Sequence, residues 1–208
     1  MSENVQGDPR PSRARPRPGL SPAEGELLAR LARESVRAHV LGIEPRLPEG
    51  LPRALLQPRP VFVTVESPPG RLRGCIGSLE PTVGLAQEVV RLAGEAALRD
   101  ARFPPLGPSD LADHRVKVSV LGDPRRIVAG SPEELLRRLR PGKEGLILEL
   151  PPHGTRSLFL PEVWEKVDND PETFLQQLCL KQGAPPDAWR RLFPQARFHV
   201  FETQVFEA

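Results

Sequence analysis

The stretch Arg71-Leu72-Arg73-Gly74-Cys75-Ile76-Gly77-Ser78-Leu79 predicts the second strand of a β-hairpin. An apolar, β-branched run over residues 61–65 predicts the first strand. The segment Ser67-Pro68-Pro69-Gly70 lies between the two runs and is typical of a tight turn. We therefore expect two neighbouring antiparallel strands here, and we work outward from them.

Cys75 is the candidate for chemistry in this hairpin. If the second strand is regular, Arg71, Arg73 and Cys75 share one face, because side chains along a strand alternate between faces. Two permanent cations beside a thiol favour the thiolate, which is its reactive form. A cysteine in a strand is also commonly a small buried apolar residue, so a structural role stays open. The flanking Gly74 and Gly77 indicate either a bulge or a place where a ligand or another backbone approaches closely.

The composition favours a reducing compartment and excludes several kinds of site. The 208 residues hold only two cysteines, Cys75 and Cys179, without zinc-binding spacing, so we expect neither a disulfide framework nor a metal site. No apolar run approaches a membrane span. No phosphate loop or dinucleotide fingerprint occurs, and we expect no cofactor. These features predict a soluble, cytoplasmic protein that is not membrane-bound.

Charge is unevenly placed along the chain. The net charge is +2, and residues 1–19 carry four arginines against Glu3 and Asp8, so the remainder is neutral. The arginine- and proline-rich arm over 1–19 is expected to be disordered, with a folded domain over 20–208. Because the folded part lacks net positive charge, nucleic acid is not its expected partner.

The order of elements predicts an α+β fold with a mixed or mainly antiparallel sheet packed with several helices. Capped helix starts occur at Ser21, Ser131 and Asp170, and another helix is expected from Thr82. Valines alternate with polar residues over 116–120 and predict a half-buried strand. Further strands are expected at 146–148 and 158–160, with one closing strand over 198–206.

Several segments resemble the AMMECR domain family, named after the AMME chromosomal region. Leu72-Arg73-Gly74-Cys75-Ile76-Gly77 is similar to its signature hexapeptide, and residues 97–106 resemble its second block. Co-linear blocks follow over 116–121, 142–147, 158–164, 174–181 and 186–189, so the resemblance covers about residues 21–208. The chain departs from the family pattern at Leu98, Ala101 and Glu144, the last standing where some members carry histidine.

The resemblance implies an α+β domain with a larger and a smaller lobe and with the cysteine motif near a cleft. It implies no settled reaction. Family members occur fused to, or encoded beside, a Memo-type protein and a radical SAM enzyme. This chain would then be one component of a modification system, with both partners as separate polypeptides.

Two main hypotheses follow for the site. In the first, Cys75 is a nucleophile or covalent carrier assisted by Arg73, which would hold an anionic group and lower the thiol pKa. The candidate substrate-binding residues are Arg71, Gly74, Gly77, Asp100 and Arg102. In the second, the protein is a non-catalytic protein- or RNA-binding module in which the Cys75 motif is structural. Whether the chain is an enzyme, and whether its substrate is a small molecule or a protein, stays open.

Overall fold

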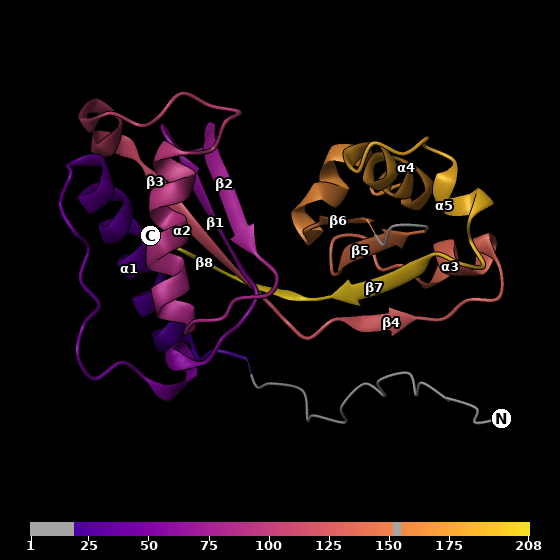
Figure 1. Ribbon diagram of the computed structural model, residues 1–208, viewed down its shortest axis with the longest axis horizontal. Coiled ribbons are helices and arrows are strands. Elements are labelled where there is room, and N and C mark those ends of the chain that lie inside the picture. The colour runs from indigo at the N-terminus through magenta and orange to yellow at the C-terminus, as the bar shows by residue number, and fades with distance from the viewer. Residues whose placement is uncertain (1–18, 152–154) are drawn as a thin grey trace, which may run out of the picture.

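The computed structural model describes residues 19–151 and 155–208, and within them the chain forms an α+β structure with a larger and a smaller lobe (Figure 1). This confirms the predicted fold class. The predicted arm over 1–19 lies outside the described residues, except for Gly19.

The larger lobe contains a four-stranded antiparallel sheet in the order β2-β1-β3-β8. Its elements are α1 (Pro22–Val40), η1 (Arg53–Leu56), β1 (Val61–Glu66), β2 (Leu72–Ser78), α2 (Leu85–Leu98), η2 (Pro108–Asp113), β3 (Arg115–Leu121) and β8 (Thr203–Glu207). β1 pairs with both β2 and β3, so the predicted hairpin forms one side of the sheet, with β2 at the edge.

Helix α1 begins where the sequence predicts. The Ser21 hydroxyl accepts the backbone N–H of Glu24, whose carboxylate accepts the N–H of Ser21, so the first turn is capped in both directions. Helix α2 differs from its prediction, because it begins at Leu85 after Gly84 rather than at Thr82. Both helices bury their apolar residues in one core.

The sheet of the larger lobe has one covered and one open face. Val61, Val63 and Val65 of β1 are fully buried in the core shared with α1 and α2. Since side chains alternate along a strand, Phe62 and Thr64 point to the opposite face. Neither α1 nor α2 covers that face, which carries the thiol discussed below.

The smaller lobe contains a second four-stranded antiparallel sheet, in the order β4-β7-β5-β6. Its elements are β4 (Arg125–Ile127), α3 (Pro132–Arg138), β5 (Gly145–Leu150), β6 (Thr155–Phe159), η3 (Pro161–Val167), α4 (Pro171–Lys181), α5 (Ala188–Arg191) and β7 (Arg197–Phe201). Trp164 stacks on Phe174 with ring centroids 3.7 Å apart, and both are buried in the lobe's core.

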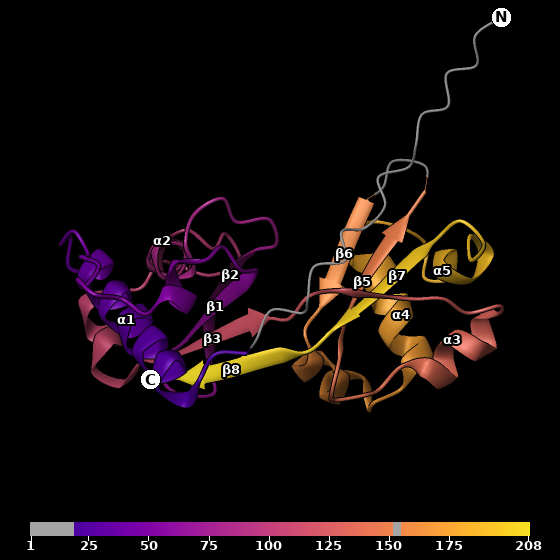
Figure 2. The same ribbon diagram turned by 90° about the horizontal axis from the view of Figure 1, so that it is seen from below.

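The chain crosses between the lobes twice, from β3 to β4 and from β7 to β8 (Figure 2). The single closing strand predicted over 198–206 was wrong, because Glu202 separates β7 and β8 and the two strands join different sheets. The Gly122 N–H donates to the Glu202 carbonyl at 2.8 Å where the crossings meet. A small apolar cluster, made of Phe62, Leu79, Leu121, Ile147, Leu158, Leu160 and Phe201, joins the lobes beside them.

Candidate functional site

Strand β2 is irregular just before the thiol. Cys75 pairs with Thr64 and Gly74 with Val65, but Glu66 then pairs with Leu72, so Arg73 is an extra residue in the ladder. Such a bulge interrupts the alternation of side chains. The regular strand on which Arg71, Arg73 and Cys75 would share a face is therefore not formed. Cys75 instead stands opposite Thr64 on the open face of the sheet.

The glycines around the thiol allow close packing. A Cβ added to Gly74 would lie 1.8 Å from the Ala96 carbonyl oxygen of α2, and one added to Gly77 would lie 2.2 Å from the Phe62 ring. Only glycine at position 74 lets β2 approach α2 this closely, and only glycine at position 77 leaves room for the Phe62 ring. This packing role is the one that the binding-module hypothesis assigns to the motif. It also sets the distance between α2 and the strand that carries Cys75.

Asp100 and Arg102 hold the main chain of Cys75 from both sides. The Cys75 N–H donates to Asp100 Oδ2 at 2.8 Å, and the Arg102 guanidinium donates to the Cys75 carbonyl at 3.0 Å. The Thr64 hydroxyl donates to the Cys75 sulfur at 3.2 Å. The structure thus brings together three residues singled out in the sequence, with Thr64 as an addition that follows only from the strand register.

The Asp100 carboxylate is ionised and almost completely buried. Its side chain is 4% exposed, while that of Arg102 is 59% exposed, and the two are joined at 2.6 Å. The Arg102 guanidinium, together with the N–H groups of Cys75 and Arg102, lowers the pKa of Asp100 to about 2. The ion pair therefore holds the main chain of Cys75 in place, while the Arg102 guanidinium remains accessible to solvent.

The thiol of Cys75 is half-buried, and burial raises its pKa above the ordinary value. The Thr64 hydroxyl and the Arg102 charge act in the opposite direction, but they do not overcome desolvation. The thiolate expected from the sequence is therefore not favoured. Cys75 carries a neutral thiol at neutral pH.

Arg73 points to a different partner from the one considered in the sequence. Its guanidinium binds the Asp110 carboxylate of η2, with the shorter contact at 2.5 Å, and only 12% of its side chain is exposed. Arg71 is exposed, and its charge also lowers the pKa of Asp110. Both arginines therefore secure η2 to the start of β2 rather than flank the thiol.

The smaller lobe contributes a cation that the sequence analysis did not single out. Lys181, the last residue of α4, donates to the Leu158 carbonyl at 2.8 Å, and its ammonium lies 5.0 Å from the centre of the Phe159 ring. Desolvation lowers the pKa of Lys181, and across the lobes the Cys75 sulfur raises this pKa while the Arg102 charge lowers it. The spacing of residues in the sequence does not link Lys181 to Cys75, because the two are far apart in the chain. Lys181 nevertheless falls within a segment that carries the family resemblance.

Glu144 is part of a different cluster. Its carboxylate binds Arg140 at 2.6 Å and Arg125 at 3.0 Å, and the Arg140 guanidinium also reaches Glu202. These partners lie in the smaller lobe and its connection, and within the described residues no contact joins Glu144 to Cys75. The departure from histidine at this position therefore does not remove a group that touches the thiol.

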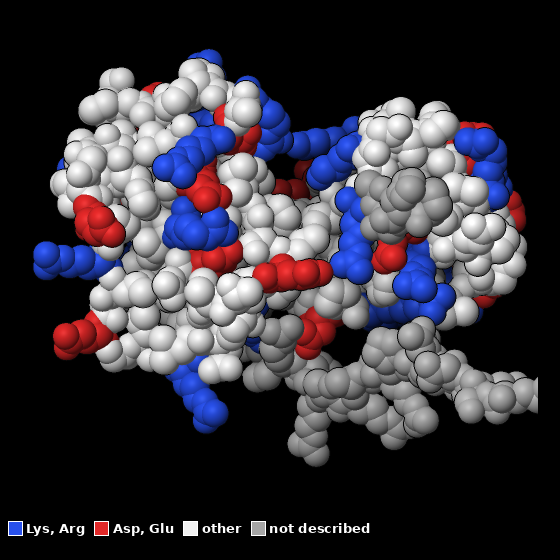
Figure 3. Space-filling model, viewed as in Figure 1, with Lys and Arg blue, Asp and Glu red and all other residues white. Residues whose placement is uncertain are grey.

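The surface is hollowed between the lobes, where basic and acidic side chains gather (Figure 3). Glu162 of η3 faces this region from the smaller lobe, since its charge acts on both Cys75 and Lys117. Over residues 19–151 and 155–208, no cluster of histidine, cysteine or acidic side chains has a metal-binding arrangement. Over the same residues, no helix is long and apolar enough to span a bilayer.

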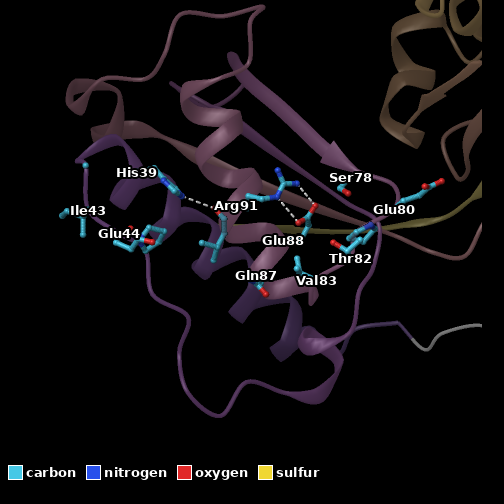
Figure 4. A pocket seen from close by; sticks show the side chains of 14 residues that line it. His39, Ile43, Glu44, Ser78, Glu80, Thr82, Val83, Gln87, Glu88 and Arg91 are labelled. Carbon is cyan, nitrogen blue, oxygen red and sulfur yellow. Dashed lines mark hydrogen bonds and ion pairs between the residues drawn. The ribbon is translucent and has the colours of Figure 1, made fainter.

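A separate groove of about 780 Å³ lies on the larger lobe (Figure 4). At its floor Glu88 is 3% exposed and binds Arg91 at 2.6 Å, which keeps the pKa of this carboxyl low. Ile43, at the groove's edge, is 59% exposed. Neither Cys75 nor Arg102 lines this groove.

Known proteins with similar sequences cover nearly the whole chain. The profile of the AMMECR1 family matches residues 29–206. A protein of Methanothermobacter thermautotrophicus is 40% identical over 188 residues, covering 90% of this chain and 95% of the relative. Protein MK0488 of Methanopyrus kandleri is also 40% identical, with 90% of each chain covered. The crystal structure of uncharacterized protein PH0010 from Pyrococcus horikoshii superimposes with a TM-score of 0.79 at 36% identity, covering 89% of this chain and 91% of that one.

Proposed function

Because this chain belongs to the AMMECR1 family, we propose that it acts through the interlobe cleft at Cys75 as one component of a modification system. A Memo-type protein and a radical SAM enzyme would be its partners, each as a separate polypeptide. The observation that carries the assignment of the site is the hydrogen bond from the Cys75 N–H to the buried Asp100 carboxylate, braced by Arg102. A buried carboxylate is costly to desolvate, so the use of Asp100 to hold the main chain of one cysteine supports a functional reason.

The roles of the candidate residues follow from their contacts. Cys75 is the residue that touches the substrate, as a nucleophile or covalent carrier. Asp100 and Arg102 position its main chain, and Gly74 and Gly77 set its place on the sheet. Arg73 binds Asp110 and thereby positions η2, and the charge of Arg71 also acts on Asp110. Since the resting thiol is neutral, a substrate or partner must complete the arrangement before Cys75 becomes nucleophilic.

The experiment is complementation of a host strain that lacks its own family member. A folded Cys75→Ser variant is expected to fail, because serine keeps the size of the side chain but not the thiol. Cys179→Ala is the matched control, since Cys179 is buried in α4 and has no part in the proposed site. Full function of Cys75→Ser, with an unchanged circular dichroism spectrum, would count against the proposal.

The partner proposal has its own measurement. Co-expression with the Memo-type and radical SAM chains of the same genome, followed by size-exclusion chromatography, is expected to yield a complex containing this chain. Separate elution of all three chains under every condition tested would contradict the partnership. It would leave the assignment of the Cys75 cleft intact.

One observation favours the second candidate function, a protein-binding module. The groove on the larger lobe is lined by acidic side chains, including Glu44, Glu80 and Glu88. Exposed apolar residues lie in the connection that follows α1. Leu41, Ile43 and Leu47 are each more than 40% exposed there. Glu88 and Glu80 are already paired with Arg91 and Arg156, so a partner segment would contact this surface chiefly through the exposed apolar residues. Retained function of Cys75→Ser together with lost function of Ile43→Asp would favour this candidate.

A further inference from the structure

The position of Lys181 is fixed by the apolar junction between the lobes. Its ammonium is bonded to the Leu158 carbonyl, and the Leu158 side chain belongs to the interlobe cluster that includes Phe62. Phe62 lies on the same face of β1 as Thr64, the cross-strand neighbour of Cys75. The ammonium on the smaller lobe therefore lies at the edge of the open face that carries the thiol.

Arg102 offers the opposing cation from the larger lobe. Its Nε and one terminal nitrogen bind Asp100, and the same terminal nitrogen reaches the Cys75 carbonyl. Among the hydrogen bonds of the described residues, none uses the other terminal nitrogen, Nη1, while the guanidinium lies 5.3 Å from the centre of the Phe103 ring and the side chain is 59% exposed. The Asp100 brace thus orients a guanidinium whose remaining donors are directed away from the pair.

Two cations on opposite walls repel each other unless something lies between them. Desolvation is the main effect that lowers the pKa of Lys181, and the Arg102 charge lowers it further, against an opposing contribution from Cys75. Lys181 bonds a neutral carbonyl and packs over Phe159, and no ion pair to its ammonium occurs among the described residues. An ammonium has three donors, so it keeps donors for a further acceptor.

We propose that the cleft binds a phosphoryl group between Arg102 Nη1 and the Lys181 ammonium, beside the Cys75 thiol. This inference rests on the proposed site and names the substrate class that it takes. A carboxylate prefers the paired N–H groups of a free guanidinium edge, but that edge of Arg102 already holds Asp100. A phosphoryl group presents oxygens in several directions and accepts donors from two separate walls.

The experiment is titration of the full-length protein with inorganic phosphate at fixed ionic strength, followed by NMR of the Lys181 side chain. Phosphate binding is expected to raise the pKa of Lys181, because an adjacent anion favours the ammonium form. Arg102→Gln and Lys181→Met are each expected to weaken binding about tenfold or more, the loss typical of a charge-assisted hydrogen bond. Lys181→Arg is expected to retain binding.

The control is Lys143→Met, which removes an exposed lysine of the smaller lobe outside the cleft and should leave phosphate affinity unchanged. Equal affinity of wild type and Lys181→Met overturns the inference. Acetate that binds as tightly as phosphate also overturns it, since the site would then have no preference for phosphoryl groups.

The outcomes separate this inference from the proposed function. If phosphate does not bind while Cys75→Ser fails to complement, the phosphoryl group is wrong and the Cys75 site stands. If phosphate binds as described while Cys75→Ser complements fully, the anion site stands and a required Cys75 thiol is wrong.

Discussion

The buried carboxylate of Asp100 accepts the backbone N–H of Cys75 at 2.8 Å, across 25 residues of sequence. This bond joins the end of helix α2 to the middle of strand β2. It places an ionised side chain directly behind the thiol's own peptide group. Several measurable properties of the protein depend on this one contact and on the packing around it.

Removing the Asp100 carboxylate should destabilise the larger lobe. Asp100→Ala leaves the Cys75 N–H without its acceptor and the Arg102 guanidinium without its partner. We expect a loss of about 2–3 kcal/mol in the free energy of unfolding, measured by urea denaturation. Asp187→Ala is the control, since the Asp187–Arg191 pair is exposed on both sides and should cost less than about 1 kcal/mol. Equal losses in the two variants would contradict the prediction.

The Asp100 contribution should depend on pH in one direction. Its folded pKa, about 2, lies below the value of about 3.9 for an unfolded aspartate, so ionised Asp100 stabilises the fold above that value. This stability is lost as the pH falls toward 2. The difference in unfolding free energy between wild type and Asp100→Asn should be constant near neutral pH and should shrink between about pH 4 and pH 2. A difference that stays constant down to pH 2 would argue against an ionised, braced carboxylate.

Cys75 should react slowly with iodoacetamide at neutral pH. Burial raises the pKa of its thiol, so the alkylation rate should still be rising above the pH at which an ordinary cysteine is fully ionised. Thr64→Val removes the hydroxyl that donates to the sulfur and should slow alkylation further. Mass spectrometry separates Cys75 from the buried Cys179, which should be labelled only after unfolding. Rapid labelling of Cys75 at pH 7 would refute the neutral resting thiol.

Gly74→Ala should be severely destabilising. Its Cβ would meet the Ala96 carbonyl oxygen at 1.8 Å, and neither the helix backbone nor the strand can yield without repacking. We expect a loss of about 3 kcal/mol or more, seen as a lower urea midpoint. Gly107→Ala is the matched control, because its Cβ would find no atom closer than 3.9 Å, and its stability should change by less than about 1 kcal/mol. Near-equal midpoints for the two variants would mean that β2 does not pack on α2 as described.

The parts of the fold that depend on local pattern could be predicted from the sequence. Ser21 caps α1 with Glu24 as expected, because a capping box involves only four consecutive residues. The apolar run of β1 and the alternating valines of β3 likewise predicted strands. The break between β7 and β8 could not be predicted, since no glycine or proline marks Glu202 and the change of sheet depends on distant strands.

The site was only partly predictable for the same reason. Cys75, Asp100 and Arg102, all named as candidate site residues from the sequence, are in contact. A bulge was one of two interpretations of the glycines in β2, but its place at Arg73 could not be predicted because it depends on the pairing with β1. Lys181 enters from the other lobe, and only the tertiary arrangement brings its charge to the thiol.

The hydrogen bond between Gly122 and Glu202 ties the two interlobe crossings together at one point. A turn of one lobe against the other would have to pivot at this point and repack the apolar cluster that joins the lobes. Cys75, Asp100 and Arg102 would travel with one lobe and Lys181 with the other. A ligand that bridges the two halves must favour one interlobe angle, so ligand affinity and lobe closure would be coupled in both directions.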